Sequence, residues 1–357
     1  MSAPAVARLS SPGEILAVLP SLCGFRPDES LVLMSLRGKR KRLGLTARVD
    51  LPPERGEAGL ARLVVDRMAA DGADAVVIAV YSEQGRRPGL VDALRTACDA
   101  RRLHVLEALH VAGALWTSYS CEQPCCPAGG TPVPTTSPAL GLVRAEQAVS
   151  GRAQLASRDE LVRSLAPPSL LGAAAADQRL HDAEEAWLRA RISHGIAASR
   201  HATLEHARVL LDRVADGGEV TPHDAALLAV GLSDVMARDG LATLVLSRAD
   251  ELLSLLVQVA RQVTPPWDAS VCALLAWTAY TKGDGGTANV ALDRALAGTP
   301  DHSLSLMLRQ CLDAGMPPDE LRQWARATQR ELRRRSADGG TTRRGRGATT
   351  PGSPSSC

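Results

Sequence analysis

The spacing of apolar residues changes its period once along this chain, and that change constrains the fold more than any other feature. Before about residue 120, short apolar runs typical of buried strands alternate with stretches of helical spacing. After residue 138, almost every apolar pattern has helical spacing. The segment between them is rich in proline and holds three of the eight cysteines. The sequence therefore predicts an α/β domain at residues 1–120, a connector at 121–137 and an all-α domain at 138–332.

The N-terminal pattern indicates the order of strands and helices. After a short capped helix over residues 11–24, the expected order is β-β-α-β-α-β-β, with strands at residues 31–36, 43–51, 75–81, 103–111 and 114–119. A strand–helix–strand connection makes parallel neighbours, whereas the short turn after the first strand makes an antiparallel pair. The order predicts a mixed sheet with helices on both faces, which is a three-layer α/β domain.

Polar residues gather where the ends of these strands are expected to meet. The strands that end at residues 50, 81 and 111 should finish at one edge of the sheet, where the first strand begins. The polar residues of this edge are Arg26, Asp28, Glu29, Ser30, Arg48, Asp50, Ser82 and Glu83. Ligands of open α/β sheets bind at the carboxyl edge, and carboxylates beside a cation and hydroxyls suit a polar ligand or acid–base chemistry. The edge is therefore a candidate ligand pocket.

A structural interpretation of the same residues stays open. Asp28 and Ser30 are typical turn residues, whose side chains bond to the nearby backbone. Arg48 and Asp50 share one face of their strand, where the arginine would neutralise the carboxylate. No glycine-rich phosphate loop accompanies the cluster, so the sequence indicates no particular ligand.

The connector contains Cys121, Cys125 and Cys126 in the spacing C-x3-C-C. Three interpretations are open: unbonded structural thiols, a disulfide or redox pair between Cys121 and Cys125 or Cys126, and a metal site. Adjacent cysteines point in different directions, and no C-x-x-C or His-x3-His pattern completes four zinc ligands. No metal is assigned and no cofactor is predicted, with zinc the least favoured interpretation. The preceding strand runs back across the sheet, so the loop is expected at the edge opposite the polar cluster, as a stiff connector between the domains.

The helical part contains one recognisable pattern. A turn at residues 283–284 is followed, at the intervals of a tetratricopeptide repeat, by Ala288, Leu292, Ala295 and Pro300. A lone repeat cannot bury its own apolar face, so this hairpin is predicted to belong to a larger helical domain. Upstream, residues 177–214 predict one long helix or two helices divided near Gly195. Residues 333–357 are rich in Arg, Gly, Ser, Thr and Pro and are predicted to form a disordered tail.

The formal net charge of +2 gives the whole chain no electrostatic affinity for nucleic acid or membranes. Two local runs are basic. The arginines of the tail are expected to make only non-specific contacts with nucleic acid, and the turn at residues 37–42 is expected to be exposed. The N-terminus lacks the pattern of a signal peptide, and no apolar run approaches the roughly 18 to 20 residues of a membrane span. A cytoplasmic protein is predicted.

Four stretches together resemble a known family. They are L-x-S-P-G-E-I-L-A-x-L-P-x-L-x-G-F-x-P-x-x-S-L-V from Leu9, T-x-R-x-D-L-P ending at Pro52, Trp116-x-Ser118 with the three cysteines, and the helical hairpin ending at Pro300. With these stretches the chain resembles the actinobacterial family described as domain of unknown function 4192, over nearly all of its length except the tail. The resemblance implies no activity.

No complete catalytic, nucleotide-binding or metal-binding signature is present in the sequence. The leading hypothesis is a cytoplasmic scaffold or regulatory protein that binds a protein partner through its helical domain, while the α/β domain senses a small ligand. The alternative is an enzyme, a hydrolase or transferase, that uses Asp50 and Glu83 at the carboxyl edge of the sheet.

Overall fold

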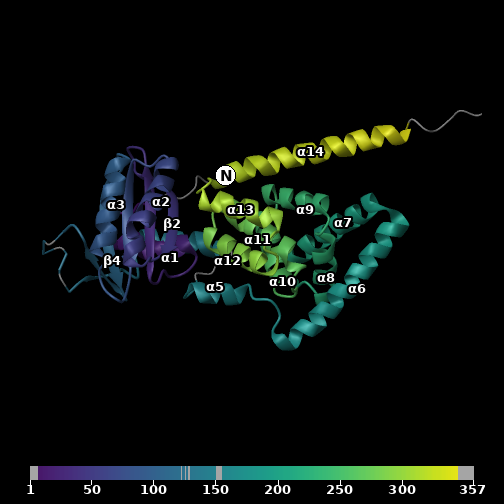
Figure 1. The fold of residues 1–357 in the computed structure, drawn as a ribbon, viewed down its shortest axis with the longest axis horizontal. Helices are drawn as coiled ribbons and strands as arrows, with labels where there is room; N and C mark the ends of the chain where they lie inside the picture. The colour runs from purple at the N-terminus through teal and green to yellow at the C-terminus, as the bar shows by residue number, and fades with distance from the viewer. Residues whose placement is uncertain (1–6, 122, 125, 128, 150–154, 345–357) are drawn as a thin grey trace, which may run out of the picture.

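A computed structural model describes residues 7–344 except 122, 125, 128 and 150–154. The chain forms an N-terminal sheet flanked by helices, followed by a part made of helices (Figure 1). The predicted fold class, an α/β domain followed by an all-α domain, is confirmed. Among the described residues, each helix is either too short or too polar to cross a lipid bilayer.

The sheet has six strands in the order β2-β1-β3-β4-β5-β6. They are β1 (Ser30–Arg37), β2 (Arg42–Asp50), β3 (Ala75–Tyr81), β4 (His104–Ala112), β5 (Leu115–Ser118) and β6 (Thr131–Pro132). The β3–β4 pair is parallel and the other pairs are antiparallel, so the sheet is mixed as predicted. Strand β6 was not predicted, because a two-residue strand that contains proline carries no alternating apolar pattern.

Helices cover both faces of this sheet. The helices α2 (Glu57–Ala70), preceded by the short η1 (Glu54–Gly56), and α3 (Pro88–Ala100) cover one face, and α1 (Pro12–Cys23) covers the other. In β1, Leu31 and Leu33 pack toward α2 and α3, whereas Val32 and Met34 pack toward α1. This double burial explains the continuous apolar run of β1.

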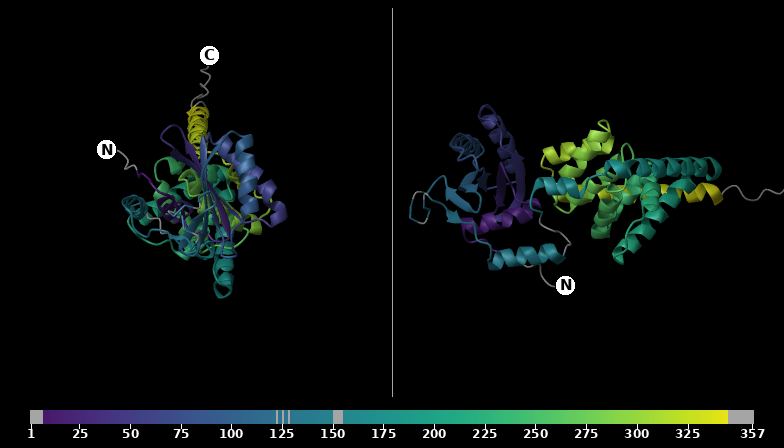
Figure 2. Two further views of the ribbon diagram at one scale, coloured as in Figure 1. Left: turned by 90° about the vertical axis from the view of Figure 1, so that its left-hand side faces the viewer. Right: turned by 90° about the horizontal axis from the view of Figure 1, so that it is seen from below.

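A further helix lies with the sheet. The helix α4 (Pro138–Val149) packs against α1, and the two lie side by side in the right-hand view of Figure 2. The predicted boundary at residue 138 places α4 in the helical domain, because the periodicity of a helix does not show which layer the helix covers.

The helical part comprises α5 (Arg158–Ser164), α6 (Leu170–His194), α7 (Ile196–Ala215), α8 (Pro222–Gly231), α9 (Val235–Ala242), η2 (Thr243–Leu246), α10 (Ala249–Ala260), α11 (Asp268–Thr281), α12 (Gly285–Gly298), α13 (Ser303–Asp313) and α14 (Pro318–Arg344). Of the two alternatives for residues 177–214, the structure has two helices divided at Gly195, which has a φ of 85°. The helices α11 and α12 form a hairpin, and nearly every residue of α11 is buried.

The helix α14 runs on to Arg344, past residue 332, where the helical domain was expected to end. Its sequence there is rich in arginine, and the ion pair between Glu331 and Arg335, 2.9 Å long, has the i, i+4 spacing that supports a helix. The rest of the predicted disordered tail, residues 345–357, lies outside the described residues.

The guanidinium of Arg294 connects several elements of the helical core. It donates hydrogen bonds to the carbonyl oxygens of Leu165 (2.6 Å), Ala260 (2.8 Å) and Val263 (2.8 Å), and it pairs with Asp268 (3.0 Å). The last carbonyls of a helix have no intrahelical partner, so a buried cation at this place satisfies them. Burial raises the pKa of Asp268, and the charge of Arg294 opposes that rise. One side chain of α12 thereby holds the ends of α5 and α10 and the start of α11.

The two parts of the chain meet at its one phenylalanine, Phe25. Phe25 follows Gly24, which ends α1 with a φ of 81°, and its ring is buried in the core of the helical part. The backbone nitrogens of Arg26 and Leu155 bond to the carbonyl oxygens of Leu155 (3.3 Å) and Gly24 (3.1 Å). A Cβ on Gly286, at the start of α12, would lie 2.7 Å from the carbonyl oxygen of Cys23. Glycine at position 286 therefore permits the close approach of the two parts.

We expect Phe25→Ala to destabilise the protein by about 3–5 kcal/mol, because it empties a buried aromatic site. It should also let the sheet and the helical part unfold at different urea concentrations. The reason is that Phe25 directly follows α1 of the α/β part, while its ring packs in the core of the helical part. Urea unfolding followed by circular dichroism and by tryptophan fluorescence measures both effects.

Leu306→Ala is the control, because this leucine is 42% exposed on α13 and should cost less than about 1 kcal/mol. A single coincident transition for Phe25→Ala with a loss no larger than that of the control would contradict the assigned role of the ring.

Candidate functional site

The predicted meeting of strand ends at one edge of the sheet is observed. Ser30, at the start of β1, pairs with both Asp50, at the end of β2, and Tyr81, at the end of β3. Tyr81 in turn pairs with Val111 near the end of β4. The eight polar residues of the candidate pocket therefore lie around one edge, as the connection rules required.

On one side of this edge, hydrogen bonds tie three loops together. The carboxylate of Glu29 accepts hydrogen bonds from the Ser82 hydroxyl (3.1 Å) and from the backbone nitrogen of Glu83 (2.8 Å). The Glu83 carboxylate accepts from the backbone nitrogen of Gly113 (2.5 Å), and Arg26 donates to the carbonyl oxygen of Gly113 (2.5 Å). These contacts use the charged atoms of Glu29, Glu83 and Arg26 to fix the loop conformations.

On the other side, Arg48 is the central residue. It donates to the Ser30 hydroxyl (2.9 Å), pairs with Asp50 (2.6 Å) and lies over the ring of Phe25 at 5.5 Å. The Ser30 hydroxyl donates to the carbonyl oxygen of Asp28. These are the turn and neutralisation contacts that the structural interpretation of the cluster predicted. They also connect the cluster to Phe25, where the two parts of the chain meet.

The same edge holds groups that the sequence analysis missed. His110 is buried in β4 with its Nε2 3.0 Å from the carbonyl oxygen of Ser82. Burial raises the pKa of Tyr81, whose hydroxyl has no hydrogen-bond partner among the described residues, and raises the pKa of the neighbouring Cys23 thiol to about 12. These residues lie inside apolar runs of the sequence, so no polar pattern marked them.

The cysteine loop lies elsewhere than expected. Strand β5 has four residues and ends at Ser118 opposite Leu109, and the backbone nitrogen of Tyr119 donates to the carbonyl oxygen of Ala108 (2.8 Å). The loop therefore leaves the sheet about halfway along β4, because β5 is too short to cross the sheet. The predicted position of the loop at the opposite edge is wrong.

Of the three cysteines, Cys121 and Cys126 are half-buried, and Cys126 packs against the core beneath α1. Cys125 lies outside the described residues. Within the part of the chain that is described, no three His, Cys, Asp or Glu side chains are grouped closely enough to hold a metal ion.

A groove of about 490 Å³ lies in the helical part, between α9, η2, α11, α13 and α14. Its lining residues are Arg238, Asp239, Ala242, Thr243, Trp277, Ser303, Leu304, Met307, Trp324, Ala325, Ala327 and Thr328. The Trp277 indole N–H donates to the carbonyl oxygen of Ala242 (3.1 Å), which fixes the ring, while Trp324 on α14 is 38% exposed. Figure 1 shows α14 lying along α13 and α9. A volume in this range, with an apolar lining and a few polar groups, is typical of ligand-binding sites.

The polar wall of the groove is formed by Arg238. Its guanidinium is mostly buried and donates two hydrogen bonds to the Asp239 carboxylate, at 2.9 and 3.1 Å. Beside it, burial and then the charge of Arg238 lower the pKa of His302, the residue that caps α13. His302 is therefore neutral near pH 7, and the wall carries the arginine–aspartate pair.

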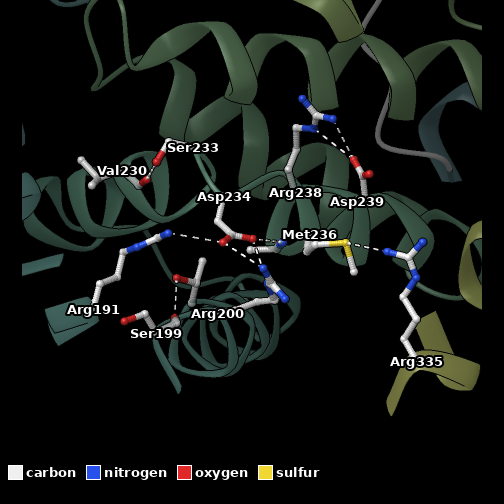
Figure 3. Close-up of polar contacts among 12 residues, drawn as sticks. Arg191, Ser199, Arg200, Val230, Ser233, Asp234, Met236, Arg238, Asp239 and Arg335 are labelled. Atoms are coloured by element: carbon white, nitrogen blue, oxygen red, sulfur yellow. Dashed lines mark hydrogen bonds and ion pairs between the residues drawn. The ribbon is translucent and has the colours of Figure 1, made fainter. Parts of the chain in front are cut away.

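The position of α9 in this groove depends on Asp234, which is shown in Figure 3. Asp234 caps α9 by accepting from the backbone nitrogen of Ala237 (3.0 Å), and it pairs with Arg200 of α7 (2.9 Å) and Arg191 of α6 (3.4 Å). Burial would raise the pKa of Asp234, but the hydrogen bonds from Arg200 and Ala237 and the charge of Arg200 outweigh burial and hold that pKa below its ordinary value. The charged carboxylate thus ties α9 to α6 and α7.

We expect Asp234→Asn to lower the free energy of unfolding by about 1–3 kcal/mol at pH 7, because asparagine keeps the helix cap but loses the charge that pairs with two arginines. The folded pKa is depressed, so the stabilisation is complete above the unfolded pKa of about 4 and is lost as the pH falls through the lower folded pKa. The difference between the two proteins should therefore shrink in acid. Urea unfolding of both at neutral pH and at about pH 3 measures it; equal differences at the two pH values would contradict the ion pairs.

Comparison with known proteins gives one match. The family model described as a domain of unknown function (DUF4192) matches residues 12–319, which extend from α1 to the start of α14. No curated protein and no solved structure matches the chain. The match covers most of the sequence and agrees with the resemblance carried by the four stretches. The chain therefore belongs to the family described as a domain of unknown function, DUF4192.

Proposed function

We propose that the protein is a scaffold or regulatory protein whose helical groove binds a short segment of a partner protein. The observation that carries the proposal is the groove of about 490 Å³ lined by Trp277, Trp324, Leu304 and Met307. Tryptophan and methionine are enriched at protein interfaces, and methionine adapts to apolar side chains of differing shape. A groove of this size suits a few apolar side chains of the partner and not a whole domain.

The charge around the groove favours an acidic partner. On α14, Arg322 and Arg335 pair with Asp319 and Glu331. The other arginines of this helix up to residue 335, for which no ion pair occurs among the described residues, are Arg326, Arg330, Arg333 and Arg334. A segment with apolar anchors for the groove and acidic residues for α14 would complement both surfaces.

The walls of the groove are fixed before a partner binds. Asp234 ties the start of α9 to α6 and α7, and Trp277 is hydrogen-bonded to the end of α9. On the other side, α14 packs against η2, α9 and α11. A preformed groove lowers the entropy cost of binding, which supports recognition of a short segment.

The alternative, a hydrolase or transferase at the carboxyl edge, has less support. The polar atoms of Glu29, Arg48 and Glu83 bond to neighbouring groups of the protein, and Asp50 pairs with Arg48. We propose instead that this cluster supports the joint at Phe25, since Arg48 contacts both the ring and Ser30.

A selection of displayed random peptides against the full-length protein tests the groove. We expect the enriched peptides to share two or more apolar residues and an acidic flank. Met307→Glu, which places a charge in the groove at a residue 37% exposed, should weaken their binding by about tenfold or more, measured by fluorescence anisotropy.

Leu306→Glu is a matched control, because it makes the same change one residue away on α13, at a residue that is 42% exposed and does not line the groove. It should change the affinity by no more than about twofold. If both variants bind equally well, or if no peptide is enriched, the groove is not the binding surface.

A further inference from the structure

We propose that the turn between β1 and β2, residues 37–42, is a binding site for the phosphate backbone of duplex nucleic acid. This basic turn has the sequence R-G-K-R-K-R and lies at the edge of the sheet opposite Asp50 and Ser82. All six residues are exposed. The inference is independent of the groove in the helical part, because it concerns a different domain and a different ligand.

Within the described part of the chain, only one of the five cations of the basic turn, Arg37, has an acidic partner. Among the described residues, no ion pair involves Lys39, Arg40, Lys41 or Arg42, although the chain as a whole has a net charge of only +2. Four adjacent uncompensated cations make a strong local field, and a ligand at contact distance responds to that field and not to the net charge.

Two aspartates near the turn fix its shape and leave these four charges unpaired. Asp71 pairs with Arg37 and accepts hydrogen bonds from the Ser35 hydroxyl and the backbone nitrogen of Leu45 (2.9 Å). Asp74 accepts from the backbone nitrogen of Gly38. The acidic groups thus hold the base of the turn, so the cations beyond it are presented on a rigid support.

The chain keeps these cations at a cost to its own stability. Arg37 and Arg42 are directly opposite each other across the strand pair, where like charges are destabilising, and Asp71 offsets the charge of Arg37 alone. Lys41 has a φ of 46°, a left-handed conformation in which glycine or asparagine would be less strained. A turn optimised only for folding would avoid both features, so they point to a role for the charge itself.

A fifth cation that has no ion pair among the described residues lies at the same edge. Ala75 of β3 pairs with both Leu36 and His104, so the segment just before β4 lies at the same edge as the turn. In that segment Arg102 is exposed and has no ion pair among the described residues, whereas Arg101 pairs with Asp66 (2.7 Å). The edge therefore offers cations from two loops, as a backbone with regularly spaced phosphates requires.

The chemistry of the turn favours a duplex over other polyanions. Arginine forks bind phosphate oxygens in pairs, and a two-stranded ribbon fits the major groove of DNA. Residues 37–42 include no aromatic side chain to stack on single-stranded bases and no apolar side chain to enter a lipid bilayer. Contacts to phosphates carry no base information, so the binding should not depend on sequence.

The test is fluorescence anisotropy of the full-length protein with a labelled DNA duplex of about 20 base pairs at about 50 mM salt. In the turn variant Lys39→Gln, Arg40→Gln, Lys41→Asn and Arg42→Gln are combined, since asparagine tolerates the conformation at position 41. We expect this variant to bind at least about tenfold more weakly, and its slope of log affinity against log salt to flatten by about 3 to 4, as four lost phosphate contacts imply.

A charge-matched control removes four exposed arginines on α2, α5, α6 and α7, through Arg62→Gln, Arg163→Gln, Arg189→Gln and Arg208→Gln. It should bind within about threefold of the unchanged protein, and circular dichroism should show both variants folded. The proposal is overturned if the unchanged protein does not bind the duplex, if the turn variant binds as well as the unchanged protein, or if both variants lose affinity equally. Binding of phosphatidylserine vesicles through the same four residues, without duplex binding, would identify a membrane contact instead.

Discussion

The insertion of Phe25 into the helical core is the contact on which the arrangement of the two parts depends. Phe25 follows α1 through the left-handed residue Gly24, and the helical part can approach closely because a Cβ on Gly286 would lie 2.7 Å from the carbonyl oxygen of Cys23. Arg48 lies over the ring and donates a hydrogen bond to Ser30, so it connects the aromatic contact to the polar cluster at the carboxyl edge. The G-F stretch near the N-terminus and the G-D-G-G turn before α12 are far apart in sequence, yet they form one contact. That contact gives a physical reason for two of the stretches that carry the family resemblance.

A second residue, the mostly buried Arg294, connects the helices of the helical part, as Phe25 connects the two parts of the chain. Its three hydrogen bonds to carbonyl oxygens and its pair with Asp268 hold α5, α10 and α11 around α12. A buried cation is tolerated here because the oxygens it meets would otherwise be unsatisfied. With α11 fixed and buried almost throughout, Trp277 has a defined position from which one wall of the groove is built. The groove is therefore a consequence of core packing and does not depend on a mobile loop.

Those parts of the structure that follow from local pattern and connection rules were predictable from the sequence. The continuous apolar run at residues 31–36 predicted β1, since such a run is typical of a strand buried on both faces. The strand–helix–strand rule predicted that Ser30, Asp50 and Ser82 lie at one edge. The length of β5 was not predictable, and an error of a few residues there moved the cysteine loop from the far edge to the middle of the sheet. The groove could not be found, because its lining comes from five elements whose relative placement is tertiary, and Trp277 and Trp324 are separated by a whole helical hairpin and more. In the sequence, both tryptophans have the spacing of ordinary helix-interface residues.

The net charge of the chain likewise does not show where charged side chains gather on the folded protein. Buried carboxylates of this chain pair with arginines, as Asp268 does with Arg294 and Asp234 with Arg200 and Arg191. Groups of neighbouring cations that have no ion pair among the described residues lie in the turn at residues 39–42 and on α14, which belong to different parts of the molecule (Figure 1). Exposed charges are screened over about 8 Å at physiological ionic strength, so the field near each surface is set by the charges of that surface. A net charge near zero over the whole chain is therefore compatible with two separate basic surfaces, one beside an apolar groove and one on a rigid hairpin.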